Sequence, residues 1–490
     1  MNSAGLWMLA ALGALVVFSG LPVWALLIGV ASGFAAIGLA AGQFDLTILA
    51  AAPSRVLNLL EHDLLQAMPL YVFVGVLLQR LPLADALYGS AARLLRGTGA
   101  APSLAGLAVG ALVAPMNGSV ASSSALLSRL VAPRLRAIGP GRAIALVSVA
   151  ATIGVVVPPS LVLILLGDTM LRAHTEASNW PGFSLGAGRI INTQDVLHAA
   201  LVPALCVQAG WAAVAWWQGR KADAAPPAQA TPAQMALAIV TVLTILLLLG
   251  GVFTGRFLAV EAAAAGGCLL AVCTVATRSL DRAGWRRVLR DTLALSGALF
   301  ALLAGAATFS LVFRLFGTDR WLADLALGTP WPPSAVVAML LVLVALCAWV
   351  LDAFEMIFVI IPIVAPVLIL KLGDAQQAAV LLLLVLQLSF LLPPMGYAVL
   401  MVRANAGLAP VRTGELLRAL APYVAVQLAV GAAVLAVPML VHLLDAPAAA
   451  AAPAASEQDI VRQMEEMGRQ APADADISPP APPPADEPRR

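Results

Sequence analysis

The chain has 490 residues, of which 61% are hydrophobic and 11% are charged, and its mean hydropathy is +0.93. This composition lies far outside the range of soluble globular proteins and predicts a polytopic, all-α membrane protein. The formal net charge of +2 and the scattered basic residues argue against nucleic acid as a partner. The four cysteines lie in apolar segments without metal or redox spacing, so we expect core thiols and no cofactor.

Ten apolar segments are candidates for crossing a bilayer, which takes about 20 helical residues. They are predicted at residues 5–19, 22–42, 64–85, 141–168, 197–218, 233–253, 257–277, 291–313, 374–402 and 421–444. A stretch rich in Ala, Pro and Gln at 222–232 predicts a flexible linker between a first half, 1–221, and a second half, 233–444. Residues 445–490 are rich in Ala and Pro, and we expect a disordered tail.

The segment at about 101–136 is too short to cross the membrane twice, which takes about 40 helical residues. Arginines flank it on both sides, including Arg96 and Arg134, so the positive-inside rule places both ends in the cytoplasm. Its centre, from Asn117 to Ser119, is small and polar. These features predict a re-entrant hairpin whose unwound tip holds an ion or solute.

The second half repeats landmarks of the first. Pro133 and Pro366 are 233 residues apart, and the double prolines that end at Pro159 and Pro394 are 235 apart. A second hairpin is predicted at about 333–371, and its sparse basic charge places its entry on the periplasmic side. We therefore expect an inverted repeat in which two hairpins meet at mid-membrane.

Each double proline removes backbone donors and forces the preceding residue out of helical geometry. The segments 141–168 and 374–402 are thus expected to be broken helices. A broken helix presents carbonyls on one half and amide groups on the other, which suit Na⁺ and an anion respectively. An isolated proline pair is more often a simple kink, but two pairs at equivalent places favour a functional break.

Polar side chains in apolar surroundings are the remaining candidates. Asp352 and Glu355 stand on one helical face, where acids favour ion coordination or proton coupling over a structural pairing. The hydroxyls of Ser119 and Ser122 are possible cation or solute ligands, although small residues also serve helix packing. The polar residues ahead of the second double proline, Gln387 and Ser389, face the same two interpretations.

Several motifs resemble one family in order and spacing. They are GLPV at 20–23, MPLYVFVG at 68–75, MNG at 116–118, GVVVPPS at 154–160, FSLVFR at 309–314, LD followed by Glu355, and LQLSFLLPPMG at 386–396. Over about residues 1–444 the chain resembles the large permease subunit of tripartite ATP-independent periplasmic (TRAP) transporters. Its second half is most similar to the branch labelled mannitol/chloroaromatic.

This resemblance implies an elevator-type secondary transporter of the bacterial inner membrane that imports a small organic acid with Na⁺. It also implies two partners, a small membrane permease subunit and a soluble periplasmic binding protein. Residues and resemblance together give expected substrate contacts at Asn117, Ser122, Ser160, Gln387, Ser389 and Gly396. Na⁺ is expected near Asn117, Gly118, Ser119, Thr152, Pro159, Asp352, Glu355 and Pro394.

The chain departs from the family pattern at three places. Many relatives have serine at the position of Asn117, threonine at that of Leu392 and asparagine at that of Val385. Each difference removes a side-chain ligand, so the resemblance leaves the number of cation sites open. The nearest alternative function is a stand-alone organic anion symporter coupled to Na⁺ or H⁺. No HExxH or GxSxG motif is present, and we expect no enzyme activity.

Overall fold

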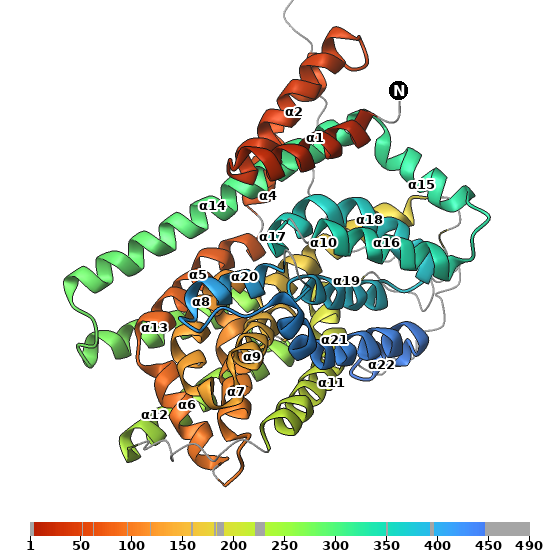
Figure 1. Ribbon diagram of the computed structural model, residues 1–490. Helices are drawn as coiled ribbons and strands as arrows, with labels where there is room; N and C mark the ends of the chain where they lie inside the picture. The colour runs from red at the N-terminus through yellow and green to blue at the C-terminus, as the bar shows by residue number, and fades with distance from the viewer. Residues whose placement is uncertain are drawn as a thin grey trace, which may run out of the picture. The chain divides into compact units, whose positions relative to one another are not determined.

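The computed structural model describes residues 4–50, 52–61, 63–95, 97–117, 119–157, 160–180, 183, 191–220, 231–348, 351–392 and 396–445. All regular elements within these ranges are helices (Figure 1). Residues 1–444 form one compact unit and 445–490 a second. Most of the predicted linker and nearly all of the predicted tail lie outside the described residues.

The first half of the chain contributes thirteen helical elements within the described residues. These are α1 (Ala4–Ser19), α2 (Val23–Ala40), α3 (Leu46–Leu49), α4 (Ala52–Leu60), α5 (Asp63–Arg80), α6 (Leu83–Leu94), α7 (Ala101–Asn117), α8 (Val120–Leu130), η1 (Ala132–Ile138), α9 (Pro140–Thr152), η2 (Ile153–Val155), α10 (Leu161–Ser178) and α11 (Thr193–Gly219). Local chemistry sets several starts. Asn192, for example, accepts the Asp195 N–H at 2.9 Å and caps α11.

The second half supplies the remaining described helices. These are α12 (Pro232–Phe253), α13 (Ala259–Ala276), α14 (Arg282–Leu315), α15 (Thr318–Gly328), α16 (Pro333–Cys347), α17 (Ala353–Glu355), η3 (Met356–Ile360), α18 (Ile361–Leu372), α19 (Ala375–Ser389), α20 (Tyr397–Asn405), α21 (Thr413–Ala436) and α22 (Met439–His442). Thr231 caps α12 by accepting the Gln234 N–H at 3.3 Å.

The order of elements from α5 to α11 recurs from α14 to α21. The starts of α8 and α17, Val120 and Ala353, are 233 residues apart, and those of α6 and α15 are 235 apart. The glycine after each hairpin has positive φ, 89° at Gly139 and 71° at Gly373, a conformation that L side chains rarely adopt. This recurrence supports the predicted repeat.

The number of full spans differs from the ten predicted. Six described helices are long and apolar enough to cross a membrane, or seven if the pair α5 and α6, bent by 66°, counts as one span. Two predicted spans are each divided at a double proline, into α9 and α10 and into α19 and α20. Two more, α1 and α13, have shorter apolar helices. The prediction rested on runs of apolar residues, and such runs do not show at which residue a helix ends.

Helix α10 continues to Ser178, beyond the predicted end of its segment at residue 168. Charged and polar side chains follow that position in the sequence, a pattern that is typical of a membrane boundary. In the structure they extend the helix, because Asp168 pairs with Arg172 one turn later at 3.1 Å and Thr169 donates to the Leu165 carbonyl at 3.0 Å.

The long helix α14 packs against α2 and α5 (Figure 1). It has 34 residues and is capped by Asp281, which accepts the Gly284 N–H at 2.7 Å. Together with α1, α6, α12 and α13 these helices are called the outer helices below. Their surface carries large exposed apolar side chains such as Leu247 and Val272, as a lipid-facing surface requires.

Three of the four cysteines are on the outside, which corrects the expectation of core thiols. Cys206, Cys268 and Cys273 are exposed and Cys347 is half-buried. In a bilayer an apolar segment is stable against lipid, so an apolar neighbourhood in the sequence does not imply burial.

The two hairpins and the broken helices form an inner block, defined as α7 to α11 and α16 to α21. Hairpin α7–α8 packs on α9 and also on α20 from the other half. Hairpin α16–α18 packs on α19 and also on α10. Each hairpin thus contacts one broken helix from each half.

Candidate functional site

The centre of the inner block is a contact between equivalent residues of the two halves. Gln387 donates from Nε2 to the Thr152 carbonyl at 3.2 Å, and these residues are 235 positions apart, the offset of the repeat. Gln427 donates to Oε1 of Gln387 at 2.7 Å. All three residues are buried. The contact joins α19 of the second half to the end of α9 of the first half.

Gln387 and Ser389 were predicted to contact substrate, and the structure engages both side chains with the protein itself. The Gln387 amide bonds at both its nitrogen and its oxygen, and the Ser389 hydroxyl donates to the Val385 carbonyl at 2.8 Å. Both side chains are buried, Gln387 at 1% exposure and Ser389 at 0%. The Gln387 bonds link α19 to α9 and α21, and the Ser389 bond lies within α19. Contact of either side chain with substrate remains a prediction.

The tip of the first hairpin lies between α7 and α8. Ser119, the residue before α8, is in extended conformation, with φ −139° and ψ 133°. Ser122, in the first turn, accepts a hydrogen bond at 2.6 Å from Nε2 of Gln79 on α5. The tip therefore touches an outer helix directly. Gly118 and the Asn117 side chain lie outside the described residues.

A glycine lets this hairpin dock on the first broken helix. A Cβ on Gly154 in η2 would lie 2.4 Å from the Ala114 carbonyl oxygen of α7. Real Cβ atoms do not approach a backbone oxygen so closely, so the two backbones meet only because residue 154 is glycine. Thr152, just before η2, is buried, and its hydroxyl donates to the Val149 carbonyl at 2.9 Å.

The tip of the second hairpin carries the two acids. Glu355 accepts the Asp352 N–H with Oε2 at 3.0 Å, which fixes the first turn of α17. Oδ1 of Asp352 is buried and has no hydrogen-bond partner among the described residues. The π-helical turn η3 follows, a geometry that occurs frequently at functional sites.

The residues that precede α10 and α20, just after the two breaks, differ in chemistry, because one is a serine and the other a glycine. Ser160 accepts the Val162 N–H at 3.2 Å and is buried at the start of α10. Gly396 precedes α20, and a Cβ there would lie 2.9 Å from the Leu392 carbonyl oxygen. Pro159 and Pro394 lie outside the described residues.

The arrangement suits a hard cation bound by oxygen atoms. Buried oxygens without a described partner include Oδ1 of Asp352 and the hydroxyls of Ser124 and Ser128 on α8. Such oxygens are costly to bury unless they bind something. In the described part of the chain no three His, Cys, Asp or Glu side chains gather in a group able to hold a metal. A bound cation would therefore rely on carbonyl and hydroxyl oxygens as well as one acid.

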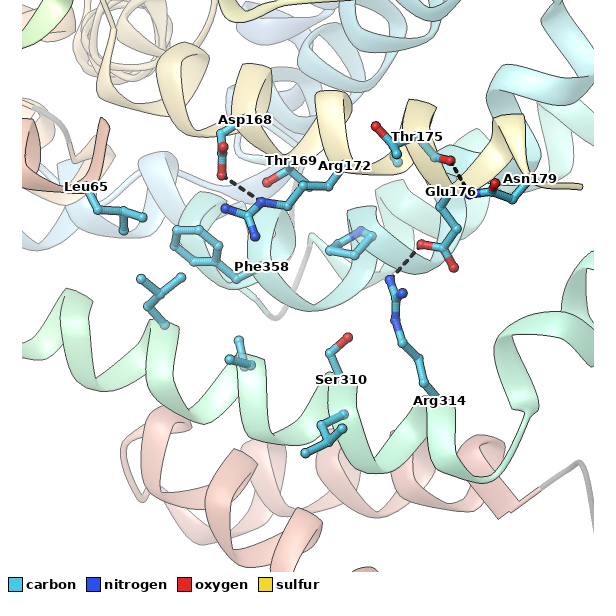
Figure 2. Close-up of a pocket in the computed structure, with 16 residues that line it drawn as sticks. Leu65, Asp168, Thr169, Arg172, Thr175, Glu176, Asn179, Ser310, Arg314 and Phe358 are labelled. Carbon is cyan, nitrogen blue, oxygen red and sulfur yellow. Dashed lines mark hydrogen bonds and ion pairs between the residues drawn. The ribbon is translucent and has the colours of Figure 1, made fainter. Parts of the chain in front are cut away.

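A cavity of about 660 Å³ separates α10 and α18 of the inner block from α14 (Figure 2). Arg314 on α14 reaches across it to Glu176 on α10, with Nη2 and Oε2 2.6 Å apart. Arg172 turns back along α10 to Asp168. A guanidinium such as that of Arg314 can bind the carboxylate of a solute. In the structure the Arg314 guanidinium is already paired with the carboxylate of Glu176.

A second cavity of about 440 Å³ lies between α8 of the inner block and the outer helices α5 and α6. Gln79 lines one part of it and Arg129 another. Arg134 pairs with Asp85 at 3.0 Å and stacks on the Tyr88 ring, 4.4 Å from its centroid. This cavity contains residues that the sequence prediction did not assign.

Three polar residues near the helix breaks were missed in the prediction: Gln79, Tyr397 and Gln427. Gln79 and Gln427 each stand in an apolar helix, which is the signal that singled out Gln387. Tyr397 directly follows the second double-proline motif. Applying the criterion for Gln387 to every span would have found the two glutamines.

Comparison with known proteins gives one family and one fold. The family model described as tripartite ATP-independent periplasmic transporter, DctM component, matches residues 9–440. The sialic acid TRAP transporter large permease protein SiaM of Vibrio cholerae is 23% identical over 395 residues, which cover 79% of this chain and 86% of SiaM.

Two longer relatives match a similar stretch. The sialic acid TRAP transporter permease protein SiaT of Haemophilus influenzae is 21% identical over 403 residues, 80% of this chain and 62% of SiaT. The isethionate TRAP transporter permease protein DctMQ of Oleidesulfovibrio alaskensis is 22% identical over 376 residues, 75% of this chain and 55% of DctMQ.

The fold is similar to that of a solved transporter. The crystal structure of the Alcanivorax borkumensis YdaH transporter superposes with a TM-score of 0.61 at 17% identity, covering 82% of this chain and 90% of YdaH. This likeness supports the fold alone.

Proposed function

The chain belongs to the DctM family as a large permease subunit of a TRAP transporter, and from this premise we propose that it imports a small organic acid together with Na⁺. Two of its relatives are named for sialic acid and one for isethionate, all small organic anions. The observation that supports the proposal is that each hairpin packs on a broken helix from each half, and that both hairpins carry buried oxygens that lack a described partner. Its membrane would be the bacterial inner membrane.

Na⁺ is proposed at the hairpin tips. Asp352 offers a buried carboxylate oxygen, and the ends of α7, α9 and α19 offer helix C-terminal carbonyls. A hard cation prefers such oxygens, and the charge at Asp352 offsets the cost of removing Na⁺ from water. The predicted cation residues around these breaks, including Ser119 and Thr152, remain part of this proposal.

An elevator motion is proposed for the inner block. Both cavities lie between this block and the outer helices, so a sliding movement has space on either side. A ligand changes a conformational equilibrium only by binding one state better than the other. Na⁺ and solute would supply that difference by closing the tips of the hairpins.

Two partners are proposed for transport. SiaT and DctMQ are longer than the stretch that this chain matches, and we propose that a separate small membrane subunit supplies the corresponding function here. A periplasmic binding protein would deliver the acid, as the family description implies. The mannitol/chloroaromatic branch remains a prediction from the sequence.

The test is uptake into liposomes that contain the chain and its small subunit. The radiolabelled solutes would include N-acetylneuraminate, isethionate and simple mono- and dicarboxylates, with and without a Na⁺ gradient and the cognate binding protein. Uptake that needs both the gradient and the binding protein supports the proposal. Uptake without any binding protein would instead favour a stand-alone symporter, with Na⁺ or H⁺ coupling read from the gradient that drives it.

A further inference from the structure

The cavity beside α8 lies next to a predicted substrate contact, Ser122. Ser122, Ala125 and Arg129 follow each other on α8 at spacings of three and four residues, so they lie on one face of the helix. This face is accessible, whereas Ser124 and Ser128 on the opposite face are buried. The cavity lies along this face from Ala125 to Arg129, and Ser122 stands one turn before it on α8.

One residue of the cavity lining contacts Ser122 directly. Gln79, which lines the cavity, donates to the Ser122 hydroxyl at 2.6 Å. From Ser122 to Arg129 is two helical turns, about 10 Å at 1.5 Å per residue. A small organic acid that leaves Ser122 along this face thus meets the guanidinium of Arg129 within about one molecular length.

Arg129 has an unusual position for an arginine. It is exposed in the cavity and makes no hydrogen bond or ion pair with any residue that the structure describes. The other lining charges, Arg134 and Asp85, pair with each other at 3.0 Å. The described lining thus has one uncompensated positive charge. A cavity of about 440 Å³ is within the size range of small-molecule sites.

We propose that Arg129 binds the carboxylate of the transported acid as it passes between the hairpin tip and the cytoplasmic side. The inference rests on the proposed function and adds the residue that holds the anion there. A guanidinium binds a carboxylate through two parallel hydrogen bonds, and it does so best where water is partly excluded. Arg134 is less suited, because Asp85 and the Tyr88 ring already hold it.

A structural role for Arg129 makes a different prediction. Arg129 lies in the last turn of α8, where any positive charge interacts favourably with the helix dipole. In that role lysine would serve as well as arginine, and the solute would not affect access to the side chain. An anion site instead predicts that a carboxylate shields the guanidinium.

The direct test is chemical modification of arginine in the purified full chain. Phenylglyoxal labelling would be followed by peptide mass spectrometry at Arg129 and at Arg136, which is exposed and does not line the cavity. We expect succinate to slow labelling of Arg129 several-fold and its uncharged diamide to have no effect, with Arg136 unchanged throughout. Equal labelling with and without succinate would overturn the site, as would an Arg129 that never reacts while Arg136 does.

Transport provides the second readout. For the acid that shows uptake, we expect Arg129→Gln to raise KM about tenfold, the effect of losing a charge-assisted hydrogen bond. Arg129→Lys should lie between it and the parent, and Arg136→Gln should leave KM unchanged. If Arg129→Gln matches Arg136→Gln, the anion site is wrong even though uptake persists. Absence of any uptake by the parent chain would count against the proposed function, while the labelling result would still decide the site.

Discussion

The two cavities lie between equivalent helices of the two halves, α14 and α18 in one case and α5 and α8 in the other, yet their charges differ. In the first, Arg172 and Arg314 each pair with a carboxylate of α10. In the second, Arg129 has no described partner. One cavity is thus internally neutralised, whereas the described lining of the other keeps one uncompensated positive charge.

The hairpin tips differ in the same way. The second tip carries Asp352 and Glu355, whereas the first carries hydroxyl groups such as Ser119 and Ser122. We propose that the two halves share a backbone arrangement and that these side chains give each tip a separate task. Substitutions in matched pairs, one in each half, test this division of labour.

The largest effect is expected from Asp352→Asn. Removing the charge removes a charge-assisted contact of about 1.5–3 kcal/mol, so the Na⁺ concentration for half-maximal uptake should rise at least about tenfold. Uptake as a function of Na⁺ measures it, with amounts of protein in the membrane compared by blot. Ser124→Ala, which removes a neutral hydroxyl from the first hairpin, should change the Na⁺ response much less. Equal responses in the two variants would show that the tips share the cation evenly.

The next effect is expected from Gly154→Ala. The added Cβ would collide with the Ala114 carbonyl, and separating the backbones should cost about 1–3 kcal/mol and loosen the hairpin. Ser389→Ala, 235 residues later, removes one hydrogen bond to Val385 and should cost about 1 kcal/mol or less. Thermal unfolding of the purified variants measures both. A Gly154→Ala protein as stable as the parent would contradict the close backbone contact.

A moderate effect is expected at the pair Glu176 and Arg314. Glu176→Gln removes the partner of the Arg314 guanidinium, so the first cavity, like the second, would have an unpaired arginine. KM for the acid should then fall about two- to fivefold. The change is modest because the ion pair is partly exposed and such pairs are weak. Arg314→Gln should raise KM. Initial rates of uptake measure both variants. If the two substitutions shift transport in the same direction, the pair acts as a mechanical link between α10 and α14 and the charge comparison is wrong.

The smallest effect is expected from Arg80→Gln. Arg80 ends α5 as Arg314 ends α14, and it bonds Asp291 at 2.6 Å. Both partners belong to outer helices and both are about one-third exposed, so the pair contributes about 0–1 kcal/mol. We expect KM to remain within about twofold of the parent, and uptake kinetics check it. A large rise would mean that the outer helices also bind solute.

The sequence predicted those features of the fold that have local causes. Two double prolines at equivalent places favour a helix break at each, and a segment of about 35 residues with arginine at both ends lacks the length for two crossings. The breaks after η2 and α19 and the hairpin between α7 and α8 follow from these rules. Helix ends were less predictable, because the pair Asp168 and Arg172 sustains α10 through residues that resemble a boundary.

The site was less predictable than the fold because its contacts join distant segments. Polarity singled out Gln387, but only packing shows that it bonds Thr152 in the other half. Likewise, the sequence places Arg129 on a hairpin without showing whether an acid faces it. Which side chain meets a solute depends on the angle at which helices pack, and that angle is set by the whole inner block.

The most direct test of the account is simultaneous measurement of radioactive Na⁺ and labelled acid entering liposomes that contain the chain and its small subunit. Coupled transport predicts that the two fluxes rise together when the loaded binding protein is present, and that Asp352→Asn lowers both fluxes together when Na⁺ is below saturation. Entry of acid without any Na⁺ flux would contradict it.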